Sequence, residues 1–318
     1  MRAVSGRRPT SWPSGNDADR CAASLVDLRR RRAFAARTCG KADRGLVGQV
    51  IHIEDADDPR TAAYRNVRER DLVGRQGLFV AEGEVVLRVL SRSRLCAPTS
   101  LLLAEKRLPA LADVIEALPD GTPVYAAGQQ AMDAIVGFPI HRGLLGLGRR
   151  LAESSAASLL SGLAPEALVL VLSGIANHDN MGGIFRNAAA FGADAVILDS
   201  DCCDPLYRKA IRVSVGAALI IPFARLTPGE DLPGLLEANG FEALALSPRG
   251  DQTLAQTERA ARTAVLLGAE GPGLSEYLLA RSRTISIPMS GEFDSLNVAA
   301  TSGIVLHHLA FMARRRTG

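Results

Sequence analysis

Residues 285–309 read ISIPMSGEFDSLNVAATSGIVLHHL and combine a β-branched run, a proline and a long apolar stretch. The β-branched run Ile285–Ile287 predicts a strand, which Pro288 ends because proline has no N–H for a sheet ladder. Ser295 is the expected N-cap of a last helix. That helix is apolar on nearly every face, which is typical of a buried helix. We therefore expect Ser295 and Asn297 at the mouth of a buried helix, where polar groups need partners.

Upstream of this stretch, short apolar runs alternate with helical patterns from Ala167 onward. Such alternation predicts a mostly parallel sheet with helices on both faces. The ligands of these sheets bind beyond the carboxyl ends of the strands. The expected strands are 169–172, 195–198, 219–223, 243–246 and 263–267, and the expected helices are 184–191, 206–213, 232–239 and 276–281.

Three loops follow strands at that carboxyl end: 177–186, 268–273 and 288–295. In the first, Asn180 is the expected helix cap, and Gly182–Gly183 would let backbone N–H groups approach another group closely. In the second, GAEGPG has neither the G-x-G-x-x-G spacing of a dinucleotide site nor the Gly-Lys-Ser/Thr of a P-loop. Each loop alone is also compatible with ordinary capping and turn chemistry.

Residues 47–150 carry a second, shorter alternation, which predicts a smaller α/β/α domain. Its expected strands are 78–83, 99–103 and 123–126, and its expected helices are 85–90, 108–118 and 129–135. The string GFPIHRG at 137–143 closes it, and His141–Arg142 is either a plain surface loop or an RNA contact. Residues 151–165, rich in Ser and Ala, are the expected linker to a domain at 166–318.

Residues 1–46 hold ten Arg and one Lys against four Asp and show no apolar period. We expect a disordered basic tail. It is open whether this tail is inert, is an RNA-binding arm, is a targeting peptide or follows from a mis-assigned start codon. The five Cys show no paired spacing, so a metal site is not expected. The lack of a disulfide pattern favours a protein of the reducing cytoplasm. No apolar run reaches the ~18 residues of a membrane span.

Three strings, N-x-G-G-I-x-R-N-A-x-x-F-G from Asn180, G-x-E-G-x-G-L from Gly268 and I-P-M-x-G-x-x-x-SLNVA from Ile287, occur in this order. Together they resemble the three motifs of the SpoU (TrmH) family of RNA ribose 2′-O-methyltransferases. F-V-A-E-G-E and GFPIHRG resemble, more loosely, the RNA-binding domain that many members carry. The resemblance implies a deep trefoil knot (the SPOUT fold), S-adenosylmethionine as cofactor and a homodimer.

The resemblance also implies site residues. The expected catalytic group is Arg186 with Asn180, Glu270, Ser295 and Asn297, and the expected cofactor-binding residues are Leu267, Gly268, Gly273, Ile287, Met289 and Leu296. A guanidinium stays protonated in proteins, so we expect Arg186 to hold the ribose-phosphate and stabilise a 2′-oxyanion, not to act as a base. Asn180 would orient Arg186 or the ribose, and Glu270 would orient its loop or pair with Arg186.

The function implied is methyl transfer to a ribose 2′-hydroxyl of structured RNA, ribosomal RNA in preference to transfer RNA. A non-catalytic RNA-binding protein of the same fold is the alternative of another class. A nicotinamide oxidoreductase would need a glycine fingerprint followed by an acidic residue, a pattern that we do not find. Neither a metal nor a membrane is an expected partner.

Overall fold

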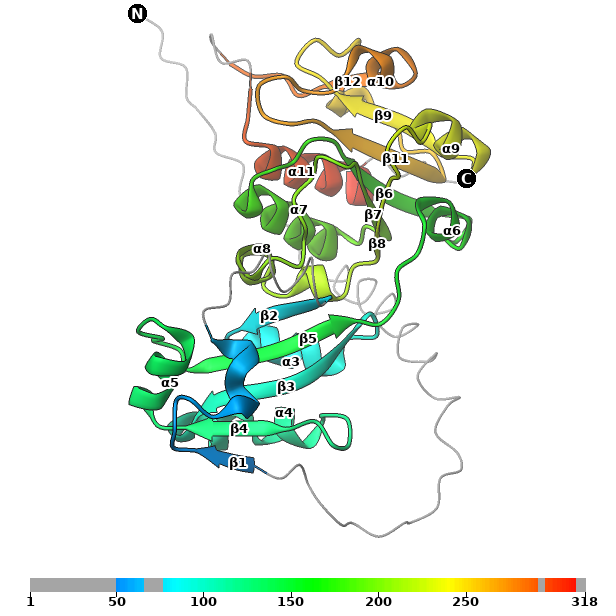
Figure 1. Cartoon of the computed structure of the whole chain (residues 1–318). Helices are drawn as coiled ribbons and strands as arrows, with labels where there is room; N and C mark the ends of the chain where they lie inside the picture. Colours follow the sequence, from blue (N-terminus) through cyan, green and yellow to red (C-terminus); the bar gives the residue numbers. More distant parts are fainter. Residues whose placement is uncertain (1–49, 66–76, 291–294, 313–318) are drawn as a thin grey trace, which may run out of the picture. The chain divides into compact units, whose positions relative to one another are not determined.

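The computed structural model describes residues 50–65, 77–290 and 295–312 (Figure 1). The expected basic tail and Gly291 of the third loop lie outside these residues. Among the helices within these ranges, none is both long and apolar enough to cross a membrane.

The first sheet is mixed, with the strand order β1-β4-β3-β5-β2. Strands β1, β4 and β3 run parallel, whereas β5 is antiparallel to both β3 and β2. Its strands are β1 (Val50–Ile53), β2 (Leu78–Glu82), β3 (Cys96–Ala104), β4 (Val124–Ala127) and β5 (Leu144–Arg150). The helices in this part of the chain are η1 (Pro59–Tyr64), α3 (Glu84–Arg92), η2 (Glu105–Leu111), α4 (Ala112–Glu116) and α5 (Gln129–Val136).

Helices cover both faces of this sheet. Successive side chains of a strand point to opposite sides, so the apolar side chains of β3 need packing partners on both faces. Leu101 and Leu103 of β3 share a core with residues of α3, including Leu87. Leu102 lies in a separate core with Met132 of α5. The mixed sheet therefore lies between two layers of helices.

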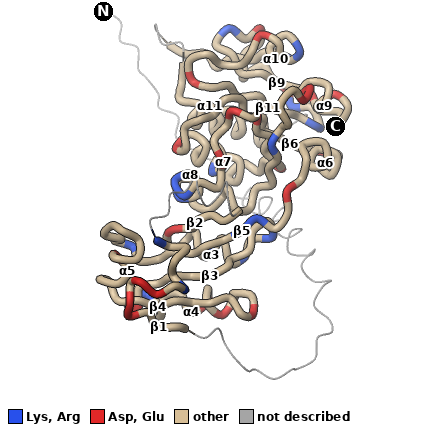
Figure 2. The backbone as a smooth tube through the Cα atoms, viewed as in Figure 1, with Lys and Arg blue, Asp and Glu red and all other residues tan. Residues whose placement is uncertain are grey.

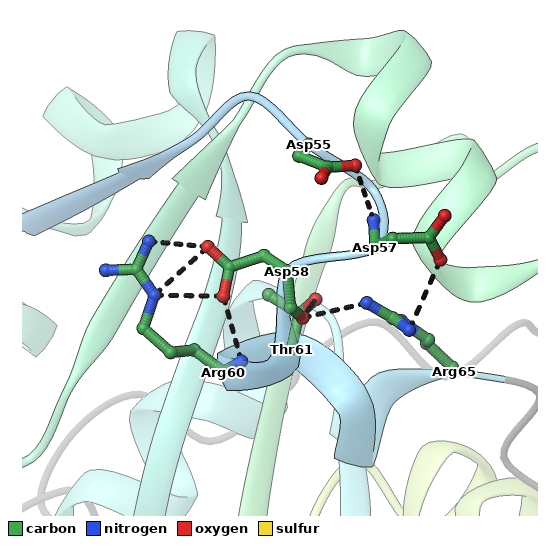
Figure 3. Close-up of polar contacts among 6 residues, drawn as sticks. All are labelled: Asp55, Asp57, Asp58, Arg60, Thr61 and Arg65. Carbon is green, nitrogen blue, oxygen red and sulfur yellow. Dashed lines mark hydrogen bonds and ion pairs between the residues drawn. The ribbon is translucent and has the colours of Figure 1, made fainter.

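The turn between β1 and η1 is fixed by a compact set of carboxylate–arginine contacts (Figure 3). Asp58 caps η1 by accepting the backbone N–H of Arg60 at 2.9 Å, and the Arg60 guanidinium donates to the same carboxylate. These hydrogen bonds from Arg60 lower the pKa of Asp58 to about 2. Arg65 donates to the backbone oxygen of Asp58 at 2.8 Å. The turn thereby positions Tyr64, whose buried hydroxyl hydrogen-bonds Ser100 at 2.7 Å.

The second sheet has the order β10-β12-β9-β11-β6-β7-β8, and every pairing in it is parallel. Its strands are β6 (Ala167–Leu172), β7 (Ala195–Leu198), β8 (Phe223–Arg225), β9 (Glu242–Leu246), β10 (Gln252–Thr253), β11 (Arg262–Leu267) and β12 (Arg283–Ser286). The helices here are α6 (Ala156–Ser161), α7 (His178–Phe191), α8 (Arg208–Val213), η3 (Ala217–Leu219), α9 (Leu232–Ala238), η4 (Leu254–Gln256), α10 (Glu276–Ala280), α11 (Val298–His307) and η5 (His308–Met312).

This sheet too is buried on both faces, as parallel sheets are. Leu168 and Leu170 of β6 pack on one side with α7, α8 and α11. Val169 and Val171 point to the other side, where α6 and α9 cover them and where α10 also packs. The parallel sheet with helices on both faces is thus confirmed.

Two strand expectations were wrong or incomplete. The apolar run 219–223 forms η3 and then β8, because the periodicity of a short apolar run does not separate strand from helix. Strand β5 was not expected, since Gly146 and Gly148 weaken the pattern. They are needed there: a Cβ at Gly148 would lie 2.5 Å from the Phe79 ring. The helix expected over 108–118 divides into η2 and α4, with Pro109 inside η2.

Gly182 and Gly183 allow the close approach expected of them, and the groups that approach belong to neighbouring helices. Both lie inside α7. A Cβ at Gly182 would lie 2.8 Å from the Ala210 carbonyl oxygen of α8, and one at Gly183 would lie 2.8 Å from the Ala299 Cβ of α11. In Figure 1, α7 and α11 lie side by side. The absence of side chains at these positions lets three helices meet closely.

Helix α11 is also less buried than its composition indicated. Val305 and Leu306 are buried, but Ile304 keeps 43% of its side-chain surface exposed. Just beyond the helix, Phe311 and Met312 are more exposed still. One face of the C-terminal helix therefore presents apolar side chains to solvent.

We predict that Gly182→Ala destabilises the protein by about 1–3 kcal/mol, because the new methyl group meets backbone on α8. A change from Gly to Ala inside a helix ordinarily stabilises by about 1 kcal/mol, so the sign is diagnostic. Gly303→Ala in α11 is the control, because the atoms nearest to its Cβ would belong to the Asn187 side chain, the first at 3.2 Å, and not to backbone. Urea unfolding measures the free energy of unfolding of both variants. A Gly182→Ala protein as stable as wild type would contradict this packing.

Candidate functional site

A cavity of about 510 Å³ lies at the carboxyl edge of the parallel sheet. Its walls come from the loops after β9, β11 and β12 and from the start of α11. All six residues expected to bind the cofactor line it: Leu267, Gly268, Gly273, Ile287, Met289 and Leu296. Glu270, Ser295 and Asn297 line it as well. Two of the three motifs therefore converge on one cavity.

The loop after β11 folds back on itself, and its glycines make this possible. The Gly273 N–H donates to the Ala269 carbonyl at 3.0 Å. A Cβ at Gly268 would lie 2.3 Å from the Gly273 carbonyl carbon. Gly271 and Gly273 adopt positive φ angles, which L side chains rarely do. The result is a loop that presents backbone N–H and C=O groups along the cavity wall.

One wall of this cavity was not expected from the sequence. Leu246 ends β9, and Ser247 and Pro248 follow it into the lining. Because β9 pairs with both β11 and β12, its end lies beside theirs. The signal was present, since the expected strand ended at Leu246 before a Ser-Pro pair, but strand order cannot be obtained from the pattern. Thr301 and Leu279 also line the cavity and had not been singled out.

Three polar side chains from three separate motifs meet beside the cavity. Asn180 donates from Nδ2 to Glu270 Oε1 at 2.9 Å. Asn297 donates from Nδ2 to the same Glu270 oxygen at 3.0 Å and to Asn180 Oδ1 at 2.8 Å. Asn180 is buried, so its amide needs these partners. We call these residues the Asn–Glu–Asn cluster.

The helix caps differ from those expected. Asn177, not Asn180, caps α7 by accepting the N–H groups of Asp179 and Asn180. Asn297, not Ser295, caps α11 by accepting those of Ala299 and Ala300. A cap must sit directly before the first helical residue to reach the N–H groups two and three positions on. Ser295 lies three residues before Val298, too early for this, and it lines the cavity instead.

Arg186 lies apart from the cluster. It is exposed on α7 and does not line the cavity. Within the described ranges it has no hydrogen-bond or ion-pair partner. Pairing with Arg186 was one of two alternatives for Glu270 and for Asn180, and in this structure both side chains bond within the cluster instead.

Some other features bear on the chemistry of the site. Among the residues that the structure describes, no group of three or more His, Cys, Asp or Glu could hold a metal ion. The thiols Cys96 and Cys202 are buried, and burial raises the pKa of Cys96 to about 11 and that of Cys202 to about 12. Neither thiol is therefore activated for nucleophilic attack.

The cluster predicts a specific response to Asn297→Asp. The new carboxylate keeps the helix cap but faces Glu270 and loses both donated hydrogen bonds. Repulsion from Glu270 raises the pKa of the introduced carboxyl group in the folded state above its value in the unfolded state. The stability of the variant therefore falls as pH rises through the folded-state pKa. We expect a loss of about 1–3 kcal/mol at pH 7 and a smaller loss at pH 5.

Asn177→Asp is the matched control, because Asn177 also caps a helix but accepts only backbone N–H groups. It should be neutral or slightly stabilising, since a carboxylate at a helix N-terminus is favourable. Urea unfolding at both pH values compares the two. Equal behaviour of the two variants would show that the cluster contributes nothing to stability.

Comparison with known proteins places this geometry in a family. Residues 167–307 match the SpoU rRNA Methylase family. The chain is 38% identical, over 88% of its length and 96% of the relative, to an uncharacterized tRNA/rRNA methyltransferase of Mycobacterium bovis. It is 31% identical, over 64% of its length and 84% of the relative, to the 23S rRNA (guanosine-2′-O-)-methyltransferase RlmB of Escherichia coli.

A solved structure gives the same picture of the fold. The AdoMet-bound rRNA methyltransferase from Sinorhizobium meliloti superposes with a TM-score of 0.68 at 24% identity, covering 81% of this chain and 97% of that one. The family suggested by the three motifs is confirmed by the match over residues 167–307 and by the relative that is 38% identical. The chain belongs to the SpoU rRNA methylase family of RNA methyltransferases.

Proposed function

We propose that this protein transfers a methyl group from S-adenosylmethionine to a ribose 2′-hydroxyl of RNA. The observation that carries the proposal is the convergence of two motif loops on one cavity, with the Asn–Glu–Asn cluster joining them to the first motif on α7. The relatives named methyltransferases support the same chemistry.

The cavity suits this cofactor in size and chemistry. Its volume of about 510 Å³ falls in the range of about 300–1,000 Å³ for small-molecule sites. Leu246, Leu267, Ile287 and Met289 offer an apolar slot for adenine, and the loop after β11 offers backbone hydrogen-bonding groups. The bound cofactor supplies an electrophilic methyl group on a sulfonium. Gly268, Gly273 and Leu296 would complete its binding.

In the mechanism that we propose, this chain's residues position and activate a poor nucleophile. Arg186 stays protonated, so it does not remove the 2′-hydroxyl proton. Its guanidinium holds the ribose-phosphate and stabilises the oxyanion that develops at O2′. The proton leaves to water or to a phosphate oxygen. Asn180, Glu270 and Asn297 hold the two motif loops and α7 in one arrangement, and Ser295 lines the site.

We further propose a homodimer in which Arg186 serves the cavity of the partner subunit. Two features support this: Arg186 does not line the cavity of its own subunit, and α11 exposes Ile304, with Phe311 and Met312 beyond it. Apolar patches of this kind mark interaction surfaces, and a symmetric dimer buries one patch against another. The knot expected from the family would thread the segment after β12 through the loop after β11.

For the substrate we propose ribosomal RNA in preference to transfer RNA, in the cytoplasm. The similarity to RlmB, named a 23S rRNA methyltransferase, supports this choice. Mapping of 2′-O-methyl sites in RNA from a strain that lacks the protein tests it. Loss of a methylated site in transfer RNA, with ribosomal RNA unchanged, would favour transfer RNA as the substrate. If no site is lost in either RNA, a non-catalytic RNA-binding protein is favoured.

Replacement of Arg186 by Lys keeps the charge but loses the planar fork of donors. We expect methyl transfer to fall by about 10²–10³-fold, while binding of S-adenosylmethionine changes by less than about twofold. Tritium transfer to RNA and calorimetric titration of the cofactor measure the two quantities. Unchanged turnover would rule out this role for Arg186.

Ile304→Asp should dissociate the dimer, because it would bury an unpaired carboxylate in an apolar interface. Val85→Asp is the matched control, since Val85 is also exposed but lies on α3. Light scattering of each variant gives the mass. A wild-type protein that is monomeric and still methylates RNA would refute the shared site.

A further inference from the structure

The proposed reaction leaves one group of side chains without a role. Phe138, in the loop after α5, keeps 39% of its surface exposed, and Arg142 follows it in the same loop. On α8, Lys209 and Arg212 are exposed and Arg208 is partly so. We call these five residues the loop–α8 surface. Figure 2 shows α8 in the blue of Lys and Arg.

Contacts hold the exposed ring in place. The Arg208 guanidinium lies 5.3 Å from the centre of the Phe138 ring, within cation–π range. Arg208 Nε also lies 3.6 Å from Glu82 Oε2 at the end of β2. Arg142 passes close to Gly83, where a Cβ would lie 3.2 Å from its Nη1. The ring and both arginines are therefore positioned against the end of β2.

The same surface continues to the candidate site. Lys209 Nζ lies 2.6 Å from Asp179 Oδ2, and Asp179 directly precedes Asn180 of the cluster. Helix α8 packs on α7 at Gly182, one helical turn before Arg186. Arg212 lies one turn after Arg208, so the helical period places both on the same side of α8. The cations thus extend from the loop to the helix that bears Arg186.

The charge and the ring indicate what binds. Arg142, Arg208, Lys209, Arg212 and Arg186 outnumber Glu82 and Asp179, the carboxylates in the described part of the chain that pair with them. Such an excess favours phosphates. A continuous duplex would use the charges but not the ring, because its bases are stacked inside the helix. An unpaired base has a free face that stacks on an aromatic side chain.

We propose that the loop–α8 surface binds single-stranded RNA next to the methylated ribose, with an unpaired base stacked on Phe138 and phosphates held by Arg142 and Arg212. This inference rests on the proposed function and names its substrate class: RNA presenting a loop or bulge, not a continuous duplex. Arg208 acts as a positioning residue, since it holds the Phe138 ring.

The test measures binding of the full-length chain to two fluorescent probes: a 12-nucleotide unstructured oligoribonucleotide and the duplex that it forms with its complement. Anisotropy titration should give at least fivefold tighter binding of the single strand. Phe138→Leu should weaken single-strand binding by about fivefold or more and leave duplex binding unchanged, because one stacking contact is lost. Phe138→Tyr should retain the affinity.

Exposed residues of α10 provide the controls, because that helix packs on the other face of the sheet. Tyr277→Leu removes an exposed ring and should change neither affinity. Arg142→Ala and Arg212→Ala should each lower the slope of log K against log salt by about 0.7 for the single strand. Arg281→Ala should leave the slope unchanged. Thermal unfolding and cofactor titration verify that each variant is folded.

Several outcomes overturn the inference. The first is a Phe138→Leu variant that binds the single strand as tightly as the wild-type protein does. The second is equal affinity of the wild-type protein for the single strand and the duplex, and the third is no RNA binding at all. The last is displacement of the single strand by polyglutamate as efficiently as by RNA. The last result would assign the surface to an acidic protein. Tritium transfer by the wild-type protein tests the proposed function separately: an enzyme that methylates RNA while Phe138→Leu binds normally refutes only this inference.

Discussion

The contact that the site depends on is the one among Asn180, Glu270 and Asn297. A single carboxylate oxygen accepts two amide N–H groups, and the two amides also bond each other. These residues are far apart in sequence, and they join the start of α7, the loop after β11 and the start of α11. Because Asn180 is buried, breaking the set would leave an unsatisfied polar group, which costs about 1–3 kcal/mol. The cavity wall is thus locked by a few charge-assisted hydrogen bonds.

Helix packing makes that contact reachable. The glycines of α7 let α8 and α11 approach within the distance that a side chain would occupy. Asn187 adds a polar tie, donating to the Ala299 carbonyl at 2.7 Å and to Ser302 at 2.9 Å. The close approach of α7 and α11 brings Asn180 and Asn297 together at their first turns. The Gly182–Gly183 pair of the first motif therefore serves helix packing, and this packing brings the site residues together.

The sequence was sufficient to predict the parallel sheet and the family, and the resemblance to that family named nine residues that line the cavity. Strand periods, helix periods and motif order are local properties, and a local pattern can be read without knowing what packs on it. The errors have a common origin. Ser295 and Asn180 are both reasonable caps by residue type, but the cap is fixed by where the helix starts, and that depends on tertiary packing. Strand β5 was missed because its glycines are required by contacts with Phe79 and Leu87, which are distant in sequence.

The order of amino acids alone therefore established which chemistry-bearing loops exist and that they follow strands of one parallel sheet. Folding in three dimensions settled which of them touch: β9 lies between β11 and β12 and adds Ser247 and Pro248 to the wall, and Glu270 bonds two asparagines in place of Arg186. Strand order and side-chain pairing are long-range properties, fixed by which surfaces pack and which polar groups that packing buries. For this reason the motif residues of the cavity could be named in advance, whereas the wall that β9 adds to it and the pairing of Glu270 with two asparagines could not.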